Sequence, residues 1–140
     1  MILLDTNAVS ELMRPSPHQD FQAWLTTSGD RVWNTTAVTI AEIEYGLQRL
    51  PFGRRRSELM RRFEVLADLF SALPLDQEAG VQAGRFRALR ESQGLSAHPS
   101  DMMIAGIAVA NGAALATRNV RDFSGLPIEL INPWDRPAAP

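Results

Sequence analysis

The chain of 140 residues contains no cysteine and no lysine, and its only histidines are His18 and His98. The missing cysteine excludes disulfide scaffolds, zinc fingers, iron–sulfur clusters and thiol nucleophiles. The missing lysine excludes a P-loop, Schiff-base chemistry and the lysine that neutralises an acyl phosphate in receiver domains. Two histidines leave little for a Ser-His-Asp triad or a polyhistidine metal site. The most plentiful reactive groups are therefore the carboxylates of sixteen Asp and Glu residues.

Long apolar runs are also missing. The N-terminal run covers only residues 2–4, which is too short for a signal peptide, and no segment approaches the ~20 apolar residues of a membrane span. We therefore expect a cytoplasmic protein with no membrane partner. The length and the 45% hydrophobic composition predict one globular domain. The net charge of −2 gives no general attraction for nucleic acid, so such binding would need a local cluster of arginines.

Short apolar runs alternate with segments of helical periodicity. Strands are expected at residues 2–4, 31–34, 72–75, 114–117 and 128–131. Helices are expected near residues 6–14, 18–27, 37–50, 54–71, 76–93 and 100–111. This alternation predicts an α/β fold whose central, mostly parallel sheet of about five strands has helices on both faces. The Pro-rich segment 133–140 is expected to form an extended or disordered C-terminal tail.

Three aspartates lie near strand ends or helix starts. Asp5 follows the first expected strand, where α/β sheets present groups to ligands, although it could equally serve as a helix N-cap. Asp101 lies in the first turn of an expected helix, where an acid also interacts favourably with the helix dipole. Because that helix is apolar nearly all round, its first turn could be enclosed, and a carboxylate there would need a partner or a cation. Asp122 follows the fourth strand, where it could also cap a turn or helix.

The expected helix 37–50 carries two glutamates that helical periodicity cannot separate. Glu42 and Glu44 lie on either side of its apolar stripe, roughly 90–110° from the centre of the stripe. Either one alone could be a solvated residue at the edge of the buried face. Periodicity therefore leaves the choice open.

Four segments resemble, in order and spacing, the signature segments of the PIN-domain family. They read MILLDTN at residues 1–7, VTIAEIEYG at 38–46, PSDMMIA at 99–105 and TRNVRDF at 117–123. The chain is most similar to the VapC toxins of prokaryotic toxin–antitoxin pairs, in their FitB-like branch, and the resemblance covers residues 1–132. It implies a PIN domain over those residues, folded as a PIN-like α/β/α sandwich. The implied activity is that of a metal-dependent ribonuclease, the toxin of such a pair.

The resemblance also assigns roles to individual residues. By motif position, the family's acidic quartet corresponds to Asp5, Glu42, Asp101 and Asp122, with Asp5 and Asp101 as metal ligands and Thr6 and Asn119 as supporting neighbours. Ligand sets made only of oxygen suit Mg²⁺ or, as a substitute, Mn²⁺. Such an ion can generate hydroxide from water and stabilise charge on a phosphodiester under in-line attack.

The motif register also selects between the two glutamates. Gly46 follows Glu42 by four residues, which places both on neighbouring turns of one helix face and leaves room beside the carboxylate. Glu44 is rotated by about 200° from Glu42, so a regular helix cannot direct both at one metal. Glu42 is therefore the predicted catalytic residue.

A cluster of arginines is the candidate RNA-binding surface. Only Glu58 opposes its five members, which are Arg54, Arg55, Arg56, Arg61 and Arg62. The alternatives are a solvated helix face or a docking surface for an acidic partner peptide. Arg85, Arg87 and Arg90 are similarly open to interpretation, because arginine stems also cover apolar surface.

The resemblance further implies three partners: an RNA substrate, a cognate antitoxin protein and a second copy of the chain in a homodimer, with a larger toxin–antitoxin assembly as an extension. Two other classes of protein are alternatives to the ribonuclease. A phosphotransfer or phosphatase domain with an acidic pocket is disfavoured, because the segment after Asp5 lacks a second Asp in a DxD motif and the chain has no lysine. A catalytically silent PIN-fold module that binds protein or RNA stays open. Metal titration in an RNA cleavage assay would separate these possibilities.

Overall fold

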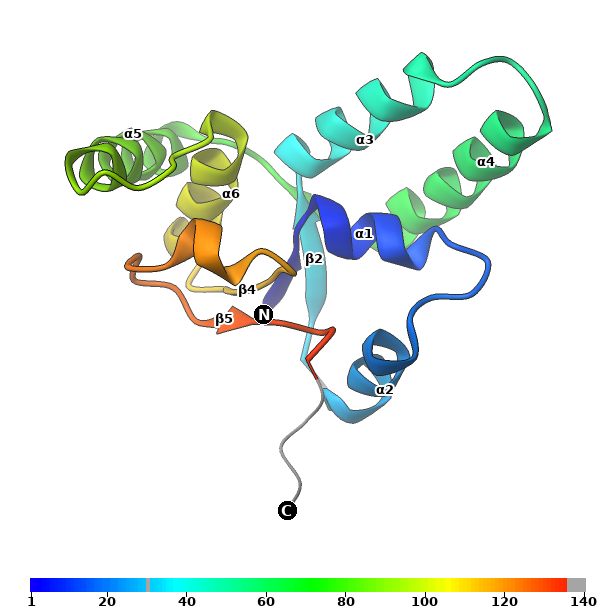
Figure 1. Ribbon diagram of the computed structural model, residues 1–140, viewed down its shortest axis with the longest axis horizontal. Coiled ribbons are helices and arrows are strands. Elements are labelled where there is room, and N and C mark those ends of the chain that lie inside the picture. Colours follow the sequence, from blue (N-terminus) through cyan, green and yellow to red (C-terminus); the bar gives the residue numbers. More distant parts are fainter. Residues whose placement is uncertain (30, 136–140) are drawn as a thin grey trace.

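The computed structural model describes residues 1–29 and 31–135 and contains the expected five-stranded sheet. The strands are β1 (Ile2–Leu4), β2 (Trp33–Thr36), β3 (Ala72–Leu73), β4 (Ala114–Ala116) and β5 (Leu130–Ile131). Their order in the sheet is β3-β2-β1-β4-β5, and every neighbouring pair is parallel. The predicted α/β class is therefore confirmed, with the N-terminal strand at the centre of the sheet (Figure 1).

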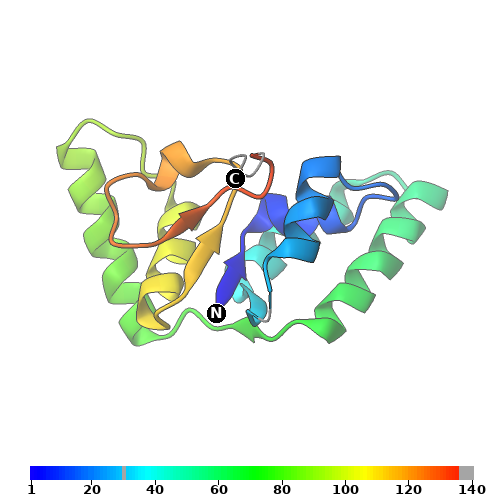
Figure 2. The same cartoon turned by 90° about the horizontal axis from the view of Figure 1, so that it is seen from below.

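Helices cover both faces of this sheet (Figure 2). They are α1 (Thr6–Leu12), α2 (Gln19–Thr27), α3 (Ala37–Arg49), α4 (Arg54–Leu69), α5 (Gln77–Ser92) and α6 (Pro99–Ala110), together with the short 3₁₀ helix η1 (Val120–Phe123). The core on one face combines Leu3 with residues of α5, α6 and η1. The core on the other face combines Ile2 and Leu4 with residues of α1, α2, α3 and α4. Successive residues of β1 thus alternate between two apolar layers, which is why a fully buried parallel strand reads as an unbroken apolar run.

The parallel register brings the carboxyl ends of the strands to one edge of the sheet. Leu4 pairs with Ala116 of β4, and the Asp5 backbone N–H donates to the Ala116 carbonyl at 3.1 Å. Thr36, at the end of β2, is also the N-cap of α3. The residues that follow β1, β2 and β4 therefore start neighbouring segments at the same edge, where ligands bind in folds of this kind.

Four of the five strands differ in their bounds from the sequence prediction. β4 ends one residue earlier than expected, at Ala116, and β5 begins two residues later, at Leu130, while β2 and β3 differ as follows. The strand expected at 31–34 lies at Trp33–Thr36, because Thr35 and Thr36 are buried in the sheet despite their hydroxyls. The Thr35 hydroxyl donates to the Leu4 carbonyl at 2.8 Å, which removes the cost of burying it. The strand expected at 72–75 ends at Leu73, because Pro74 has no N–H for a sheet hydrogen bond.

The start of the expected tail packs against the domain. Pro133 is buried and Trp134 is half-buried, with its ring centroid 5.0 Å from that of Phe21. The expectation of an extended or disordered tail is therefore wrong at these two positions, since aromatic burial outweighs the effect of the flanking prolines. Residues 136–140 lie outside the described residues, and the domain limit at residue 132 stays a prediction. No helix in the described ranges has the length and apolar character to cross a membrane.

The closest approach between α5 and α6 depends on a glycine, which gives a stability prediction. A Cβ atom at Gly106 would collide with the Ala79 carbonyl oxygen and lie 2.9 Å from the Ala83 nitrogen. Gly106→Ala should therefore lower the free energy of unfolding by about 2–3 kcal/mol, measured by urea denaturation. Gly84→Ala is the matched control, because a Cβ there meets nothing within 4 Å, and it should stabilise α5 by about 0.5–1 kcal/mol. Equal effects of the two substitutions would contradict this packing.

Candidate active site

Asp5 is a helix cap and a buried acid at the same time. It follows β1, its Oδ1 accepts a 2.9 Å hydrogen bond from the Ala8 N–H at the start of α1, and only 5% of the residue is exposed. Burial raises the pKa of Asp5 to about 6, against the opposing effect of hydrogen bonds from Thr117 and Ala8. The negative charges of Asp101 and Glu42 raise this pKa further. The N-cap and the ligand-facing interpretations of Asp5 are therefore compatible.

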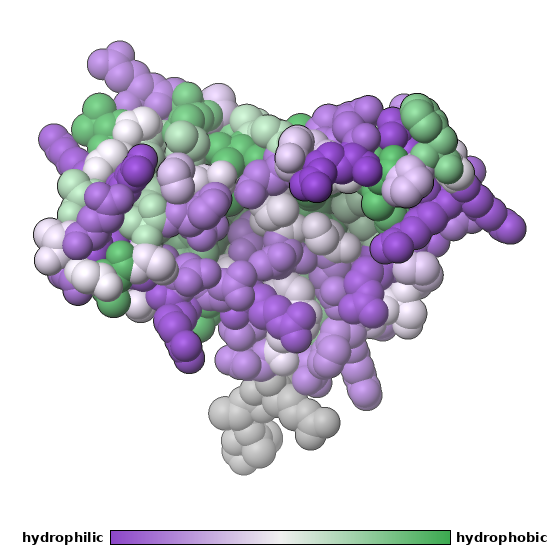
Figure 3. Space-filling model, turned by 45° about the horizontal axis from the view of Figure 1, so that its top comes forward, coloured by the Kyte–Doolittle hydropathy of each residue, from purple (hydrophilic) through white to green (hydrophobic). Residues whose placement is uncertain are grey.

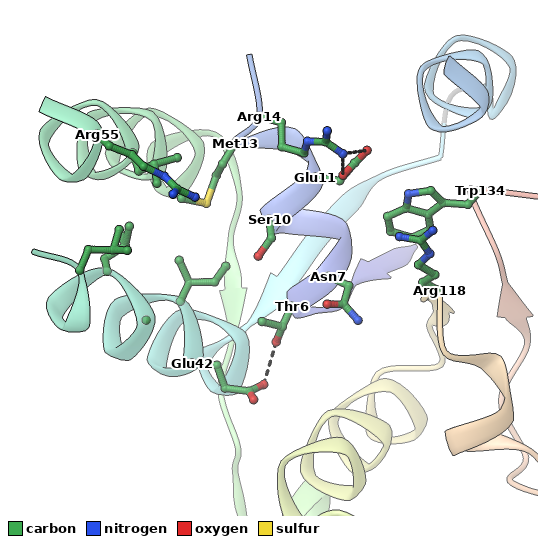
Figure 4. A pocket seen from close by; sticks show the side chains of 15 residues that line it. Thr6, Asn7, Ser10, Glu11, Met13, Arg14, Glu42, Arg55, Arg118 and Trp134 are labelled. Carbon is green, nitrogen blue, oxygen red and sulfur yellow. Dashed lines mark hydrogen bonds and ion pairs between the residues drawn. The ribbon is translucent and has the colours of Figure 1, made fainter. Parts of the chain in front are cut away.

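Glu42 is held toward Asp5 by a hydroxyl from α1. The Thr6 side chain donates to Glu42 Oε1 at 2.7 Å, which joins the first turn of α1 to the middle of α3 (Figure 4). The Thr6 oxygen also lies 3.3 Å from the buried Thr39 hydroxyl, and Thr39 lies 3.3 Å from the Thr36 hydroxyl. Because Thr6 has one proton and gives it to Glu42, it can only accept from Thr39. A row of hydroxyl groups thus leads from the α3 N-cap to the carboxylate.

Glu44, the other glutamate of the helix, is turned elsewhere. It is exposed, and its Oε1 accepts a 2.8 Å hydrogen bond from the Gln48 amide on the outside of α3. The structure therefore places Glu42, and not Glu44, beside the end of β1. This geometry agrees with the motif register.

Asp101 and Asp122 complete the acidic edge from the other half of the molecule. Asp101 lies in the first turn of α6 and Asp122 lies on η1, and both are half-buried. Burial raises the pKa of Asp101, and the negative charges of Asp122 and Glu42 raise it further. Positive charge from His98 and Arg90 acts in the opposite direction. The charges of Glu42 and Asp101 thus act on Asp5, and those of Glu42 and Asp122 act on Asp101, which places the four predicted acids along one edge.

Two buried threonines belong to this edge although the sequence prediction named only Thr6. Thr117, at the end of β4, is fully buried and hydrogen-bonds to the Asp5 side chain, while its Oγ1 accepts from the Asn119 N–H at 3.0 Å. Thr39 lies in the hydroxyl row described above. A threonine directly after a buried strand was the available signal for Thr117. For Asn119, the predicted supporting neighbour, the hydrogen bond at this edge comes from the backbone.

The fit of a metal ion depends on how many protein ligands it needs. Across residues 1–29 and 31–135, no three Asp, Glu or His side chains lie close enough together to hold one ion. A zinc or calcium site built wholly from protein ligands therefore does not match this geometry. Mg²⁺ differs because it keeps several waters and is held by one or two carboxylates together with substrate phosphates. Asp5 and Asp101, two acids whose pKa burial raises, fit that smaller requirement.

A cavity of about 500 Å³ opens beside Glu42 and is enclosed mainly by α1, α3 and α4. Arg55 enters it from α4 and Arg118 from the end of β4, where the guanidinium carbon lies 5.5 Å from the centre of the Trp134 ring (Figure 4). At the rim, the buried Glu11 accepts from the His18 N–H at 2.7 Å and pairs with Arg14 at 3.3 Å. In the space-filling view, hydrophobic patches lie along the upper part of the molecule, and hydrophilic residues cover most of the surface below them (Figure 3).

The structure separates the predicted arginine cluster. Arg54 pairs with Glu58 at 3.1 Å on the surface, and Arg56 donates to the Leu50 carbonyl at 3.0 Å, which satisfies the end of α3. Arg62 donates to the Met13 carbonyl at 2.9 Å and thereby fixes the loop after α1.

Of the five predicted residues, only Arg55 lines the cavity that Glu42 also lines. Arg61 instead borders a separate groove with Val65 and Leu66. Arg54, Arg56 and Arg62 are thus engaged in contacts within the fold, and RNA binding by this cluster stays a prediction.

The chain matches a known protein family and is similar to known proteins over nearly its full length. The PIN domain family model matches residues 2–128. The VapC ribonuclease Y4jK of Sinorhizobium fredii is 35% identical over 138 residues, covering 96% of this chain and 99% of the relative. Toxin FitB of Neisseria gonorrhoeae is 31% identical over 137 residues, with the same coverage of both chains.

Solved structures of FitB complexes are also similar to this chain in fold. The crystal structure of FitAcB from Neisseria gonorrhoeae superposes with a TM-score of 0.85 at 31% identity, covering 96% of this chain and 99% of that one. The structure of FitAB bound to the IR36 DNA fragment superposes with a TM-score of 0.87 at 29% identity, over the full length of both chains.

The raised pKa of Asp5 predicts how stability depends on pH. Between the ordinary value of 3.8 and about 6, the folded state holds the Asp5 proton while the unfolded state releases it, so stability falls as pH rises through this range. Asp5→Asn keeps an N-cap and carries no charge. In chelator it should match the wild type near pH 4 and be more stable by on the order of 2–3 kcal/mol at pH 7, measured by urea denaturation.

Asp76→Asn is the matched control for this experiment. Asp76 caps α5 through a 2.9 Å hydrogen bond from the Ala79 N–H, but it is exposed. Its substitution should not stabilise the protein at pH 7, because an exposed carboxylate has no burial cost for the amide to remove. A constant difference between wild type and Asp5→Asn across the pH range would show that burial does not act on Asp5.

Proposed function

Because the chain belongs to the PIN-domain family and has VapC and FitB toxins as nearly full-length relatives, we propose that it is a metal-dependent ribonuclease, the toxin of a toxin–antitoxin pair. The observation that carries the proposal is the meeting of Asp5, Glu42, Asp101 and Asp122 at one edge of the sheet, where burial raises the pKa of Asp5 to about 6. A divalent cation would offset the cost of burying these carboxylates and, to a smaller extent, the repulsion among them. The proposed reaction is hydrolysis of an RNA phosphodiester bond.

The proposed chemistry divides roles among the chain's own residues. Asp5 and Asp101 would hold Mg²⁺ or Mn²⁺, and the bound ion would activate water and stabilise charge on the phosphate. Glu42 Oε1 is occupied by the Thr6 hydroxyl, so we assign Oε2 to accept a proton from the attacking water. Asp122, placed next to Asp101, would add negative charge that strengthens cation binding.

The proposed partners follow from the relatives. Two of the similar solved structures are named for FitA together with FitB, and one of these is bound to DNA. They support a cognate antitoxin as the partner of this chain, and we propose that the antitoxin is a separate protein. An RNA substrate, supported by the ribonuclease names among the relatives, and a homodimer complete the proposal.

Metal dependence is the direct test of this proposal. Purified protein should cleave unstructured RNA in Mg²⁺ or Mn²⁺, and excess chelator should slow cleavage by at least ~100-fold, because the carboxylate site has no other electrophile for the phosphate. Asp101→Asn, purified in the same way, should stay folded and lose cleavage, which excludes a contaminating nuclease. Full activity in chelator would reject metal dependence. No cleavage under any condition would favour the catalytically silent binding module.

A pair of glutamate variants tests the assignment of Glu42. Glu42→Gln should lose at least ~2.7 kcal/mol of transition-state stabilisation, about a hundredfold in rate, because the amide cannot accept the proton. Glu44→Gln makes the same chemical change two residues along α3, on the exposed side, and should stay within roughly threefold of wild type. Both rates are measured at identical metal and RNA concentrations. A larger loss for Glu44→Gln would refute the motif register.

A further inference from the structure

Arg90, on α5, is a buried cation whose hydrogen bonds all go to main-chain or hydroxyl oxygens. Only 2% of the residue is exposed. Its Nε donates to the Ser96 carbonyl at 2.7 Å, its Nη2 donates to the Arg121 carbonyl at 3.3 Å, and its Nη1 donates to the Ser124 carbonyl. Within the described residues, no carboxylate lies within ion-pair distance of this guanidinium.

These carbonyl groups belong to two segments that carry predicted site residues. Two of the carbonyls lie on either side of Asp122 in the chain, at η1 and just after it. The third lies in the loop that leads from α5 into α6, five residues before Asp101. One guanidinium group thus connects the segment of Asp122 to the segment that starts α6.

The energetics argue against a purely space-filling role. A buried cation costs free energy unless its donors are satisfied, whereas the other buried residues of α5, which are Ala79, Ala83 and Phe86, carry no charge. Arginine offers several donors in a rigid planar fork, which can hold carbonyls in separate directions at once.

The segment held by this fork has little stability of its own. It is a 3₁₀ helix of four residues whose N-cap, Asn119, makes no side-chain capping hydrogen bond. The position of Asp122 therefore depends on tertiary contacts. The buried Phe123 anchors η1 in the core, and the guanidinium adds hydrogen bonds to the main chain on both sides of Asp122.

We propose that Arg90 is a positioning residue that fixes Asp122 on η1 relative to Asp101 on α6 by binding the main chain of both segments. This inference deepens the proposed function and rests on it for the link to cleavage. The effect on η1 itself follows from the contacts alone.

The test uses Arg90→Lys and Arg90→Gln with Phe63→Leu as the control. Lysine keeps the positive charge and loses the fork, while glutamine keeps a planar donor and loses the charge. Phe63 is buried on α4 in the opposite core, away from η1, so its truncation lowers stability without touching the proposed contacts. Each protein is measured at the same interval below its own Tm, so that a general loss of stability cancels.

Hydrogen exchange without metal or RNA is the first measurement. In both Arg90 variants, the amide hydrogens of residues 119–125 should exchange at least tenfold faster than in wild type, while those of β1 and α3 stay protected. Phe63→Leu should leave residues 119–125 within threefold of wild type. Unchanged exchange of this segment in Arg90→Lys would overturn the proposal, since the charge alone would then be sufficient. If Arg90→Gln does not fold, the lysine variant alone decides.

Kinetics and metal binding form the second measurement. Arg90→Lys should lower kcat by about 10- to 100-fold, leave KM for RNA within threefold and weaken Mn²⁺ binding, measured by calorimetry, by about tenfold. Phe63→Leu should change none of these by more than threefold. If wild type neither binds Mn²⁺ nor cleaves RNA, the proposed function fails, while the exchange data still decide whether Arg90 orders η1. Rapid exchange with normal kcat and Mn²⁺ affinity would refute the positioning role.

Discussion

Parallel pairing of five short strands is the constraint on which the rest of the structure depends. Parallel strands end at one edge, so the residues after β1, β2 and β4 meet there whatever their charge. In this chain they bring Asp5 next to the acids carried by α3, α6 and η1. Burial and like charge both disfavour the ionised forms, and this is why the pKa of Asp5 and that of Asp101 are raised. The surrounding groups act to keep this cluster in place.

The cost of holding these carboxylates together is partly offset by neighbouring groups that donate hydrogen bonds or carry positive charge. The first turn of α1 donates an N–H to Asp5, and Asp101 lies where the positive end of the α6 dipole is strongest. Hydroxyls of Thr6 and Thr117 reach Glu42 and Asp5. These donors are neutral, so they orient the carboxylates without cancelling their charge. The proposed cation site depends on this remaining negative charge.

Sequence reasoning succeeded where the information is local. The alternation of strands and helices follows from periodicity, and the position of Asp5 follows from one strand and one cap. Sequence reasoning failed where a side chain is hydrogen-bonded to a residue far away in the chain. Thr35 could not be predicted inside a strand, because its hydroxyl is satisfied 31 residues away at Leu4. Nor could the sequence show that Arg56 and Arg62, two members of the predicted arginine cluster, bind the carbonyls of Leu50 and Met13. The burial of Arg90 likewise depends on segments more than thirty residues away.

The same repulsion links stability to function. Below pH 6 the proton held by Asp5 lowers the charge of the cluster, and a divalent cation would do so at higher pH without the proton. In the proposed function, protons and cations would compete for the same carboxylate oxygens, so a variant that stabilises the metal-free fold by removing a carboxylate charge would bind the cation less well. Substitutions that remove a carboxylate charge would raise the free energy of unfolding of the metal-free protein. Residues that hold the carboxylates together would instead favour binding of the proposed cation. An acidic edge that lowers the stability of the isolated chain is what the proposed function predicts, because the proposed cation and RNA phosphate would complete such a site only when they bind.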